Sequence, residues 1–439
     1  MKKNLAFMYV LAGSLALASC ESEKFADPTQ DWKDVSVLKL SSEMQKVRDY
    51  VPANAVFAHR GSTFWVPEET EAAFRWARNV GADYIEADLQ ITQDGVILAL
   101  HDYDLRRTTN IENVYPEKEN QPASSFTYKR LMALDAGSWF NDAKPEQARP
   151  GFKSQKQYIS TLQDLIMFAQ GKRIKRDANG NRVYHITDVV LGGKSGKDTI
   201  SANYNLEYED DPADNGNRPG IYIETKEPWV NPGVELATYK ELDKLGWNII
   251  TKPATSTDHF ITDSKGRTNR VNIGNTNGKV ILQTFSQESL RNLFKVFKGK
   301  VPTCYLLWLG NGATDMPKDE PRNYAEFINF GIQNGAHFMG PSIPGAPNNY
   351  PNLLKPWQAG LIHKSGMRTH AYSFDSYEQM SQFFGEYNYG TVVDGITLPY
   401  VDGMFTNRAD ITLDYYHSKQ VRPHGKEKSA TEVLNDLGY

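Results

Sequence analysis

The chain has 439 residues, a length compatible with two or three domains or with one large α/β barrel that carries insertions. Hydrophobic residues make up 40% of the chain and charged residues 23%, which is typical of a folded soluble protein and excludes a low-complexity or disordered chain. The formal net charge of −4, without a long basic stripe, argues against a nucleic-acid-binding protein.

The first segment predicts an export signal. MKKNLAFMYVLAGSLALASC begins with two lysines, continues with an apolar run and ends in small residues. Its last four residues resemble the lipobox of bacterial lipoproteins, in which the cysteine is lipidated and becomes the mature N-terminus. We therefore expect a lipoprotein signal peptide over residues 1–19 and a cell-envelope protein, periplasmic or surface-exposed, that is anchored to the membrane through Cys20. An ordinary cleaved secretion signal is the alternative.

Residues 20–50 predict a tether and a short N-terminal helix, and from residue 51 onwards apolar runs alternate with helical patterns. Eight strands are expected, at Ala55–Ala58, Tyr84–Ile91, Ile221–Thr225, Val280–Phe285, Cys304–Leu309, His337–Met339, Thr369–Phe374 and Gly403–Thr406. Helices are expected at Glu69–Val80, Gly233–Leu245, Gln287–Val296, Tyr324–Gln333, Asn352–Ser365 and Tyr377–Phe384. This alternation indicates a parallel sheet with helices outside it. Eight strands predict a (β/α)₈ TIM barrel over residues 51–420, with a C-terminal tail at 421–439. A doubly wound open sheet is the competing architecture.

Two polar segments rich in turn-forming residues interrupt the alternation, at about 103–158 and 171–219. Insertions of this length are typically covers of a functional site or disordered.

The cysteine content indicates that the fold is held together by its hydrophobic core and not by a disulfide. If Cys20 is lipidated, only Cys304 remains, and it cannot form an internal disulfide. Because Cys304 lies in the apolar run TCYLLWL, we expect a buried and unreactive thiol.

The stretch YIEADLQITQDGVILALHD, residues 84–102, predicts a β-hairpin after the second strand that carries three ionisable groups. Asp94-Gly95 favours a two-residue turn, which would place Asp88 directly opposite His101. Glu86 is two residues from Asp88 and shares its face of the strand. Two carboxylates and an imidazole would then converge, an arrangement that is costly unless a cation or a substrate relieves it. The alternative is a solvated hairpin edge.

Other strands end in the same kinds of residues. VFAHRG brings His59 and Arg60 to the carboxyl end of the first strand, and GIYIETKE brings Glu224 and Lys226 to the end of another. The carboxyl ends of the strands are where barrel enzymes hold their catalytic groups. Three strand ends that deliver histidine, carboxylate and cationic groups therefore predict an active site.

An ordered set of motifs resembles the glycerophosphodiester phosphodiesterase (GDPD) family of barrels. The motifs are AHRG at 58–61, PEETEAAF at 67–74, GADYIEADLQITQDGVILALHD at 81–102, STLQDLI at 160–166, YIETK at 222–226, ILQTFSQESL at 281–290 and VDGMFTNRAD at 401–410. Together they span about residues 55–410, the whole of the expected barrel.

The resemblance implies roles for seven residues. Metal ligation is implied for Glu86, Asp88 and Glu224, acid–base catalysis for His59 and His101, and phosphate contact for Arg60 and Lys226. Three carboxylates suit one hard divalent cation, Ca²⁺ or Mg²⁺, and the sequence leaves the choice open. The implied reaction is hydrolysis of a glycerophosphodiester to an alcohol and sn-glycerol 3-phosphate, with attack by the glycerol 2-hydroxyl followed by opening of a cyclic phosphate.

Departures from the family pattern bear on specificity. Many members have asparagine at the position of Glu69, tryptophan near Tyr372 and aspartate at the position of Asn407. Glu68 could orient His59 or Arg60, or could cap the following helix.

Two other functions compete with the leading hypothesis. One is a related phospholipase D-like barrel that acts on lysophospholipid or sphingomyelin. The other is a tethered binding protein that retains the barrel without catalysis. The sequence does not determine the alcohol head group or the oligomeric state.

Overall fold

The computed structural model describes residues 32–193, 198–309, 319–384, 391–393, 396–398, 400–423 and 425–439. The predicted signal peptide over residues 1–19 and the predicted lipidation of Cys20 lie outside these ranges. Within the described residues, no helix has both the length and the apolar character needed to cross a membrane.

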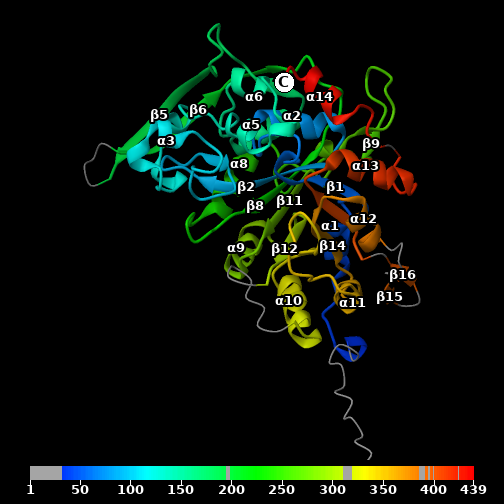
Figure 1. Cartoon of the computed structure of the whole chain (residues 1–439). Coiled ribbons are helices and arrows are strands. Elements are labelled where there is room, and N and C mark those ends of the chain that lie inside the picture. The colour runs from blue at the N-terminus through cyan, green and yellow to red at the C-terminus, as the bar shows by residue number, and fades with distance from the viewer. Residues whose placement is uncertain are drawn as a thin grey trace, which may run out of the picture.

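Eight parallel strands form a closed barrel (Figure 1). The strands are β1 (Ala55–Ala58), β2 (Tyr84–Ile91), β8 (Gly220–Thr225), β11 (Val280–Thr284), β12 (Thr303–Leu307), β13 (Phe338–Pro341), β14 (Arg368–Phe374) and β17 (Gly403–Thr406). They pair in the order β1-β17-β14-β13-β12-β11-β8-β2, and a further pairing between β1 and β2 closes the ring. The predicted TIM barrel is confirmed, and the open doubly wound sheet is excluded.

Helices surround the barrel and pack their apolar faces on it. They are α2 (Glu71–Val80), α7 (Leu162–Ala169), α8 (Val234–Lys244), α9 (Gln287–Phe297), α10 (Pro321–Gln333), α11 (Pro356–Lys364), α12 (Tyr377–Phe384) and α13 (Ala409–Ser418). Local sequence explains their ends. Thr70 caps α2 by accepting the Ala73 N–H, and Gly81 ends it with φ 102°, a value that glycine adopts without strain.

The barrel strands are buried on both faces, as parallel strands covered by helices must be. One apolar cluster fills the inside of the barrel and includes Phe57, Tyr222, Cys304 and Phe405. A larger cluster lies between the strands and the helices. The Cys304 thiol is fully buried, and burial raises its pKa to about 12, so the predicted unreactive thiol is confirmed.

The hairpin after β2 is present, but its predicted register is wrong. The Gly95 N–H donates to Thr92 O, and Gly95 has φ 86°, so the turn is a three-residue loop with glycine in the left-handed region. The extra loop residue shifts the pairing by one position. Asp88 therefore lies opposite Leu100, whose N–H donates to Asp88 O at 2.8 Å, and His101 follows beyond the ladder. The paired positions of β2 and β3 (Ile97–Ala99) are Leu89↔Ala99, Gln90↔Leu98 and Ile91↔Ile97.

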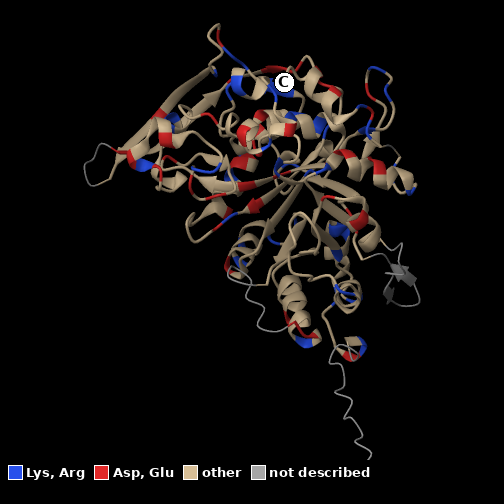
Figure 2. Ribbon diagram, in the orientation of Figure 1, with Lys and Arg blue, Asp and Glu red and all other residues tan. Residues whose placement is uncertain are grey.

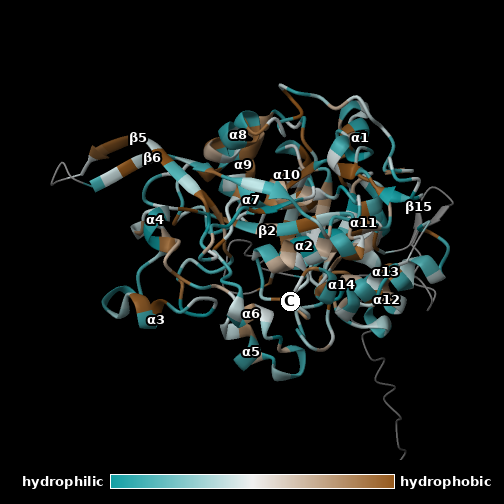
Figure 3. Cartoon of the chain, turned by 90° about the horizontal axis from the view of Figure 1, so that it is seen from above, coloured by the Kyte–Doolittle hydropathy of each residue, from teal (hydrophilic) through white to brown (hydrophobic). Residues whose placement is uncertain are grey.

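Both interrupting segments are folded parts of the molecule. Residues 103–158 contain α3 (Ile111–Val114), α4 (Tyr128–Leu131), α5 (Trp139–Ala143) and α6 (Gly151–Ser154). Phe126, Phe140 and Phe152 of this segment are buried in the outer cluster. Residues 171–219 contain β4 (Lys172–Ile174), β5 (Tyr184–Gly192), β6 (Asp198–Leu206) and β7 (Tyr208–Asp210). β5 and β6 form a two-stranded ribbon that extends away from the barrel, and part of β5 is strongly hydrophobic (Figures 1 and 3).

The remaining elements are short. They are α1 (Ser42–Arg48), β9 (Phe260–Ile261), β10 (Arg270–Val271), β15 (Thr391–Val393), β16 (Ile396–Leu398) and α14 (Ala430–Asp436). The C-terminal segment is attached to the fold, because the Trp76 indole N–H of α2 donates to Ala430 O at 3.0 Å. Acidic and basic residues are mixed over the whole molecule, and neither sign of charge dominates the side shown in Figure 2.

Candidate active site

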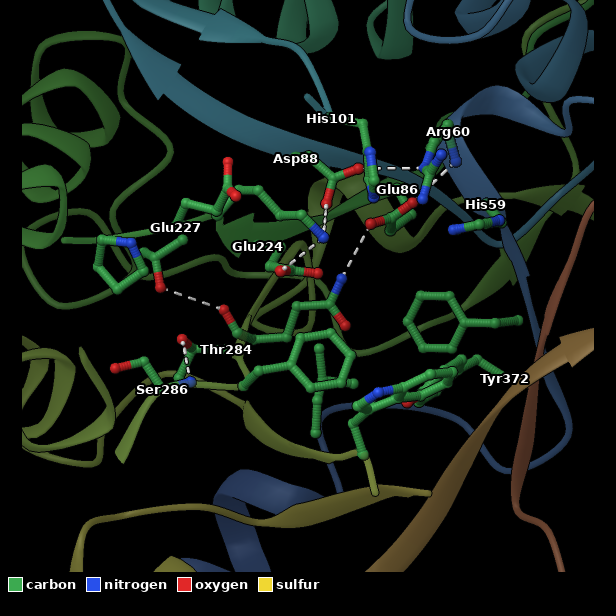
Figure 4. Close-up of a pocket in the computed structure, with 18 of the residues that line it drawn as sticks. His59, Arg60, Glu86, Asp88, His101, Glu224, Glu227, Thr284, Ser286 and Tyr372 are labelled. Carbon is green, nitrogen blue, oxygen red and sulfur yellow. Dashed lines mark hydrogen bonds and ion pairs between the residues drawn. The ribbon is translucent and has the colours of Figure 1, made fainter. Parts of the chain in front are cut away.

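A cavity of about 700 Å³ opens at the carboxyl ends of the barrel strands. All seven residues predicted to form the active site line it, and six of them are labelled in Figure 4. The seven are His59, Arg60, Glu86, Asp88, His101, Glu224 and Lys226. They come from β1, β2 and β8, which are neighbours in the barrel, and from the segment after β3.

The His-Arg-Gly turn directly after β1 presents His59 and Arg60. The three residues form a single 3₁₀ turn, in which Arg60 has φ 50° and ψ 33° and Gly61 has φ 83°. Such backbone angles are rare for arginine and are typical of functional sites. Gly61 is required by space as well, since a Cβ at this position would lie 2.5 Å from the Ala73 Cβ of α2.

The three acidic residues form one compact cluster. Glu86 and Asp88 lie two residues apart on β2, and Glu224 of β8 is directly paired with Asp88 across the two parallel strands. One oxygen from each carboxylate lies within 4.8 Å of the other two, and all three side chains are buried. Three carboxylates this close repel one another unless a cation binds between them.

Hydrogen bonds fix the orientation of the cluster. Glu86 accepts the Arg60 backbone N–H at 2.8 Å and the Gln283 side-chain amide at 2.9 Å. The Asp88 backbone N–H donates to a Glu69 carboxylate oxygen at 2.7 Å. The side chains therefore keep their positions for a ligand.

Two cationic side chains lie beside the carboxylates. Arg60 Nε is 3.2 Å from Asp88 Oδ2, and Lys226 Nζ is 3.4 Å from Glu224 Oε1 and 3.8 Å from Asp88 Oδ1 (Figure 4). Both cations line the cavity, where an anionic group would meet them. Charge-assisted contacts from fixed donors of this kind are well suited to phosphate.

The pKa values of the three carboxyl groups diverge. Burial and the neighbouring Asp88 raise the pKa of Glu86 well above its usual range, and burial is also the main reason that the pKa of Glu224 rises to about 8. Burial acts in the same direction on Asp88, but Lys226, His101 and Arg60 together hold its pKa well below its usual range. The cluster without a cation is therefore expected to carry less negative charge than three ionised carboxylates would.

The two histidines have different partners at Nδ1. His59 Nδ1 lies 2.7 Å from the Asn407 amide oxygen, so this nitrogen carries the proton and Nε2 keeps its lone pair. Burial and the charge of Arg60 lower the pKa of His59 to about 3. His59 is therefore a neutral imidazole across the physiological pH range.

His101 Nδ1 instead contacts a carboxylate, Asp102 Oδ1, at 2.5 Å. Burial and Arg60 lower the pKa of His101, while Asp88 and Asp102 oppose that change. A carboxylate partner stabilises the imidazolium form, which an amide oxygen does to a much smaller extent. The two imidazoles are thus suited to different roles.

The structure also decides the position of two acidic residues in the β1–α2 segment. Arg60 Nη1 donates to Glu68 Oε1 at 3.4 Å, a contact that the orienting role requires, whereas α2 is capped by Thr70, so the capping role of Glu68 is wrong. Glu69 is buried at φ 57° and bonded to Asp88. Burial, with Asp88 next, raises the pKa of Glu69, which reduces the negative charge expected from the sequence at this position.

Aromatic side chains form the wall opposite the charged groups. Tyr372 lines the cavity, whereas Phe374 is buried and is not one of the lining residues. Sequence reasoning missed the other members, which are far apart along the chain: one lies in β17, and the others follow strands or lie in loops. They are Trp229, Phe285, Trp308, Tyr350 and Phe405.

Sequence reasoning also missed polar members of the site. Arg107 and Gln283 line the cavity, and Asp102 holds His101. Gln283 carried a usable signal, because it is a polar residue near the carboxyl end of an apolar strand. Asp102 follows His101 directly, but adjacency alone does not predict a contact between their side chains.

Comparisons with known proteins agree with this arrangement. Residues 59–229 match the model of the glycerophosphoryl diester phosphodiesterase family. The glycerophosphodiester phosphodiesterase of Bacillus subtilis (strain 168) is 27% identical over 356 residues, which cover 81% of this chain and 83% of that protein. Human glycerophosphodiester phosphodiesterase domain-containing protein 5 is 35% identical over 141 residues, but these span only 30% of this chain and 23% of the human protein.

The fold comparison is independent of sequence. A crystal structure from Silicibacter pomeroyi DSS-3, assigned to the glycerophosphoryl diester phosphodiesterases, superposes with a TM-score of 0.51 at 14% identity. The superposition covers 87% of this chain and 99% of that one, so the shared barrel extends over most of both chains.

Proposed function

We propose that this chain is an enzyme of the glycerophosphoryl diester phosphodiesterase family and that it hydrolyses glycerophosphodiesters to an alcohol and sn-glycerol 3-phosphate. The observation that carries the proposal is the convergence of two differently partnered histidines on a three-carboxylate cluster flanked by two cations. Such a site fits a phosphodiester, because it offers charge stabilisation and two proton-transfer groups together.

The carboxylate cluster fits one divalent cation, Ca²⁺ or Mg²⁺. Glu86, Asp88 and Glu224 supply only oxygen donors, which both ions prefer. Asp88 Oδ2 is buried, and its ion pair with Arg60 Nε at 3.2 Å lacks the geometry of a hydrogen bond, so this oxygen has capacity for a further ligand. When bound, the cation would polarise the phosphoryl oxygens and neutralise the charge that develops on them.

Arg60 and Lys226 would hold the phosphate group. Both positively charged side chains already contact the carboxylate cluster in the absence of substrate. Fixed positive charge at a developing negative charge stabilises the transition state more than mobile water can.

His59 is the proposed general base. Its Nδ1 proton is held by Asn407, so Nε2 can take the proton from the attacking hydroxyl, which we assign to the glycerol 2-position. The new P–O bond forms a cyclic phosphate as the P–O bond to the alcohol breaks.

His101 is the proposed general acid. The Asp102 carboxylate stabilises its imidazolium form, and a bound phosphodiester anion would add to this effect. Its Nε2 proton passes to the departing alkoxide. Water then opens the cyclic phosphate, with the two histidines acting in the reverse direction to return both to their starting protonation states.

A substrate panel tests the proposal. Glycerophosphocholine, glycerophosphoethanolamine and a lysophospholipid are incubated with the full chain in the presence of Ca²⁺ or Mg²⁺, and release of the free alcohol head group is measured for all three, with sn-glycerol 3-phosphate measured for the two water-soluble diesters. We expect turnover of the water-soluble diesters. Cleavage of the acylated compound alone would instead favour the phospholipase D-like alternative.

We also propose that the protein is a lipoprotein of the cell envelope. The support is the order of lysines, apolar run and small residues before Cys20 in the sequence. Expression of the full chain and of a C20S variant in bacteria, with mass spectrometry of the N-terminus, tests this proposal. Release of wild-type protein without lipid would contradict it.

A further inference from the structure

Arg107 makes the densest set of ionic contacts near the catalytic groups. Its Nη1 and Nη2 donate to the two oxygens of Glu68 at 2.9 and 2.7 Å. Its Nε and Nη2 donate to the two oxygens of Asp102 at 2.6 and 3.1 Å. One guanidinium therefore forms a bidentate pair with each of two carboxylates.

The segment that carries Arg107 is held firmly. Leu105 is fully buried, and Thr108 and Thr109 are nearly so. The Thr109 hydroxyl donates to the Leu105 carbonyl oxygen. Because the residues on both sides of Arg107 are anchored, its long side chain leaves the segment in a defined direction and lines the cavity.

The contacts of Arg107 lead directly to the proposed general acid. Asp102 accepts from Arg107 through both of its oxygens, and its Oδ1 also contacts His101 Nδ1 at 2.5 Å. Glu68 holds the other side of the guanidinium and is itself buried. Glu68, Arg107, Asp102 and His101 thus form one continuous chain of charge-assisted hydrogen bonds.

We propose that Arg107 is a positioning residue: it fixes the Asp102 carboxylate, which in turn fixes His101 for proton donation to the leaving alcohol. The inference rests on the proposed function and assigns a catalytic contribution to the 103–158 insertion. Proton transfer requires close alignment of donor and acceptor, so a rotated imidazole would lose rate even if it kept its proton.

Direct contact with the substrate phosphate is the competing role, because Arg107 lines the cavity and its side chain is 43% exposed. The hydrogen-bond inventory argues against it. A guanidinium has five N–H groups, and four contacts to Glu68 and Asp102 occupy most of them. Lysine keeps the charge but cannot form two bidentate pairs, so the two roles predict different results for an Arg107→Lys variant.

The experiment measures steady-state kinetics of full-length Arg107→Gln and Arg107→Lys variants on two esters of sn-glycerol 3-phosphate. One ester has an alkyl alcohol, choline, and the other has p-nitrophenol, a leaving group that needs little protonation. Arg106→Gln is the matched control, since Arg106 pairs with Asp104 at 3.0 Å and lies outside the cavity lining. Thermal melting checks that each variant is folded.

We expect kcat on the choline ester to fall about 10- to 100-fold in Arg107→Gln, the usual effect of removing a group that orients a catalytic residue. KM should change by less than about threefold, because the phosphate contacts remain. The loss should be much smaller on the p-nitrophenyl ester, Arg107→Lys should not restore the rate, and Arg106→Gln should behave as wild type.

Three results would overturn the proposal. One is an Arg107→Gln variant with wild-type kcat, and another is an equal loss on both esters. The third is a raised KM with unchanged kcat that lysine corrects, which would make Arg107 a phosphate contact.

If Arg107→Gln does not fold, Asp102→Asn in the wild-type background gives the same test through the same chain of contacts. Where both variants fold, the double variant should lose no more than Asp102→Asn alone, and additive losses would also contradict the proposal. An inactive wild-type protein would refute the proposed function instead, and the two failures are therefore distinguishable.

Discussion

Replacing Asn407 by aspartate would place a negative charge on the residue that holds the proposed general base. In the structure the Asn407 amide oxygen lies 2.7 Å from His59 Nδ1, and the His59 pKa is about 3 because burial and Arg60 disfavour the charged ring. A carboxylate at hydrogen-bond distance raises the pKa of a histidine by roughly 1–3 units, which corresponds to about 1.4–4 kcal/mol.

The direction of the effect on activity follows from these values. The His59 pKa should rise to between about 4 and 6, so that the ring remains mostly neutral at pH 7.5 and becomes a stronger base. With a higher pKa, the base becomes protonated, and therefore inactive, at a higher pH. The acid limb of kcat/KM should therefore shift to higher pH by roughly 1–3 units, with activity at pH 7.5 equal to wild type or higher.

The neighbouring Asp375 requires a matched control. Asn407 is a hydrogen-bond donor to Asp375, and an aspartate at 407 would set two carboxylates side by side. The exchanged pair, Asn407→Asp with Asp375→Asn, keeps one carboxylate and one amide, so it isolates the effect on His59.

The assay combines pH–rate profiles at saturating cation with an NMR titration of the histidine ring nitrogens. An unchanged His59 pKa and an unchanged acid limb in both variants would refute the reasoning that the Nδ1 partner sets the basicity of this ring.

The other predictions concern the histidines, the cation and the turn after β1. His59→Ala and His101→Ala should each lower turnover by about 10²- to 10⁴-fold, the usual contribution of a general acid or base, while calorimetry should still detect cation binding because neither ring belongs to the carboxylate cluster. EDTA should abolish activity, and Ca²⁺ or Mg²⁺ should restore it. Since burial raises the Glu224 pKa to about 8, protons compete with the cation below that pH, so calorimetric cation affinity should increase from pH 6 to 8. Gly61→Ala should lower the free energy of unfolding by at least about 2 kcal/mol in urea denaturation, because its Cβ would lie 2.5 Å from a side-chain atom of α2 at φ 83°.

Each of these predictions has a clear control. Near-normal activity of either histidine variant would contradict its assigned role, and activity that survives exhaustive chelation would contradict the need for a cation. Cation affinity that is constant from pH 6 to 8 would contradict the raised Glu224 pKa. Gly95→Ala is the matched control for Gly61, since it has φ 86° with open space around it and should cost only about 1–2 kcal/mol.

Much of the fold could be predicted because the pattern of apolar residues along the chain indicates which positions are buried. The barrel strands are apolar on both faces, and the predicted strand at Ala55–Ala58 coincides with β1. The convergence of the proposed site residues on one cavity was also predictable, since they interrupt apolar strands where parallel strands end in a barrel. Interactions within one strand or between adjacent strands follow from spacing alone.

The hairpin register shows where local rules fail. Asp94-Gly95 favours a two-residue turn in isolation, but Asp94 accepts the Tyr128 backbone N–H and the Tyr204 hydroxyl from two distant segments. These tertiary contacts stabilise a three-residue loop. His101 reaches the cavity all the same, so its proximity to Asp88 was predicted correctly from an incorrect register.

The roles of Arg107 and Glu69 depend on contacts that no short-range pattern contains. Arg107 contacts a residue 39 positions away, and Glu69 contacts one 19 positions away. Polar insertions such as 103–158 give little periodic signal, even though Phe126 and Phe140 within it are buried in the core. The sequence therefore indicated the ionisable residues that line the cavity better than the residues that hold them.

The closure of the barrel makes the general base dependent on completion of the fold. His59 follows the first barrel strand and its partner Asn407 follows the last, and the two meet because β1 pairs with β17. In a chain on which β17 has not docked, the proposed cation-binding carboxylates on β2 and β8 would be present, but the group that sets the tautomer of His59 would be absent. On the proposed function, such a chain would bind a cation without turning over substrate, so activity would require the pairing of β1 with β17.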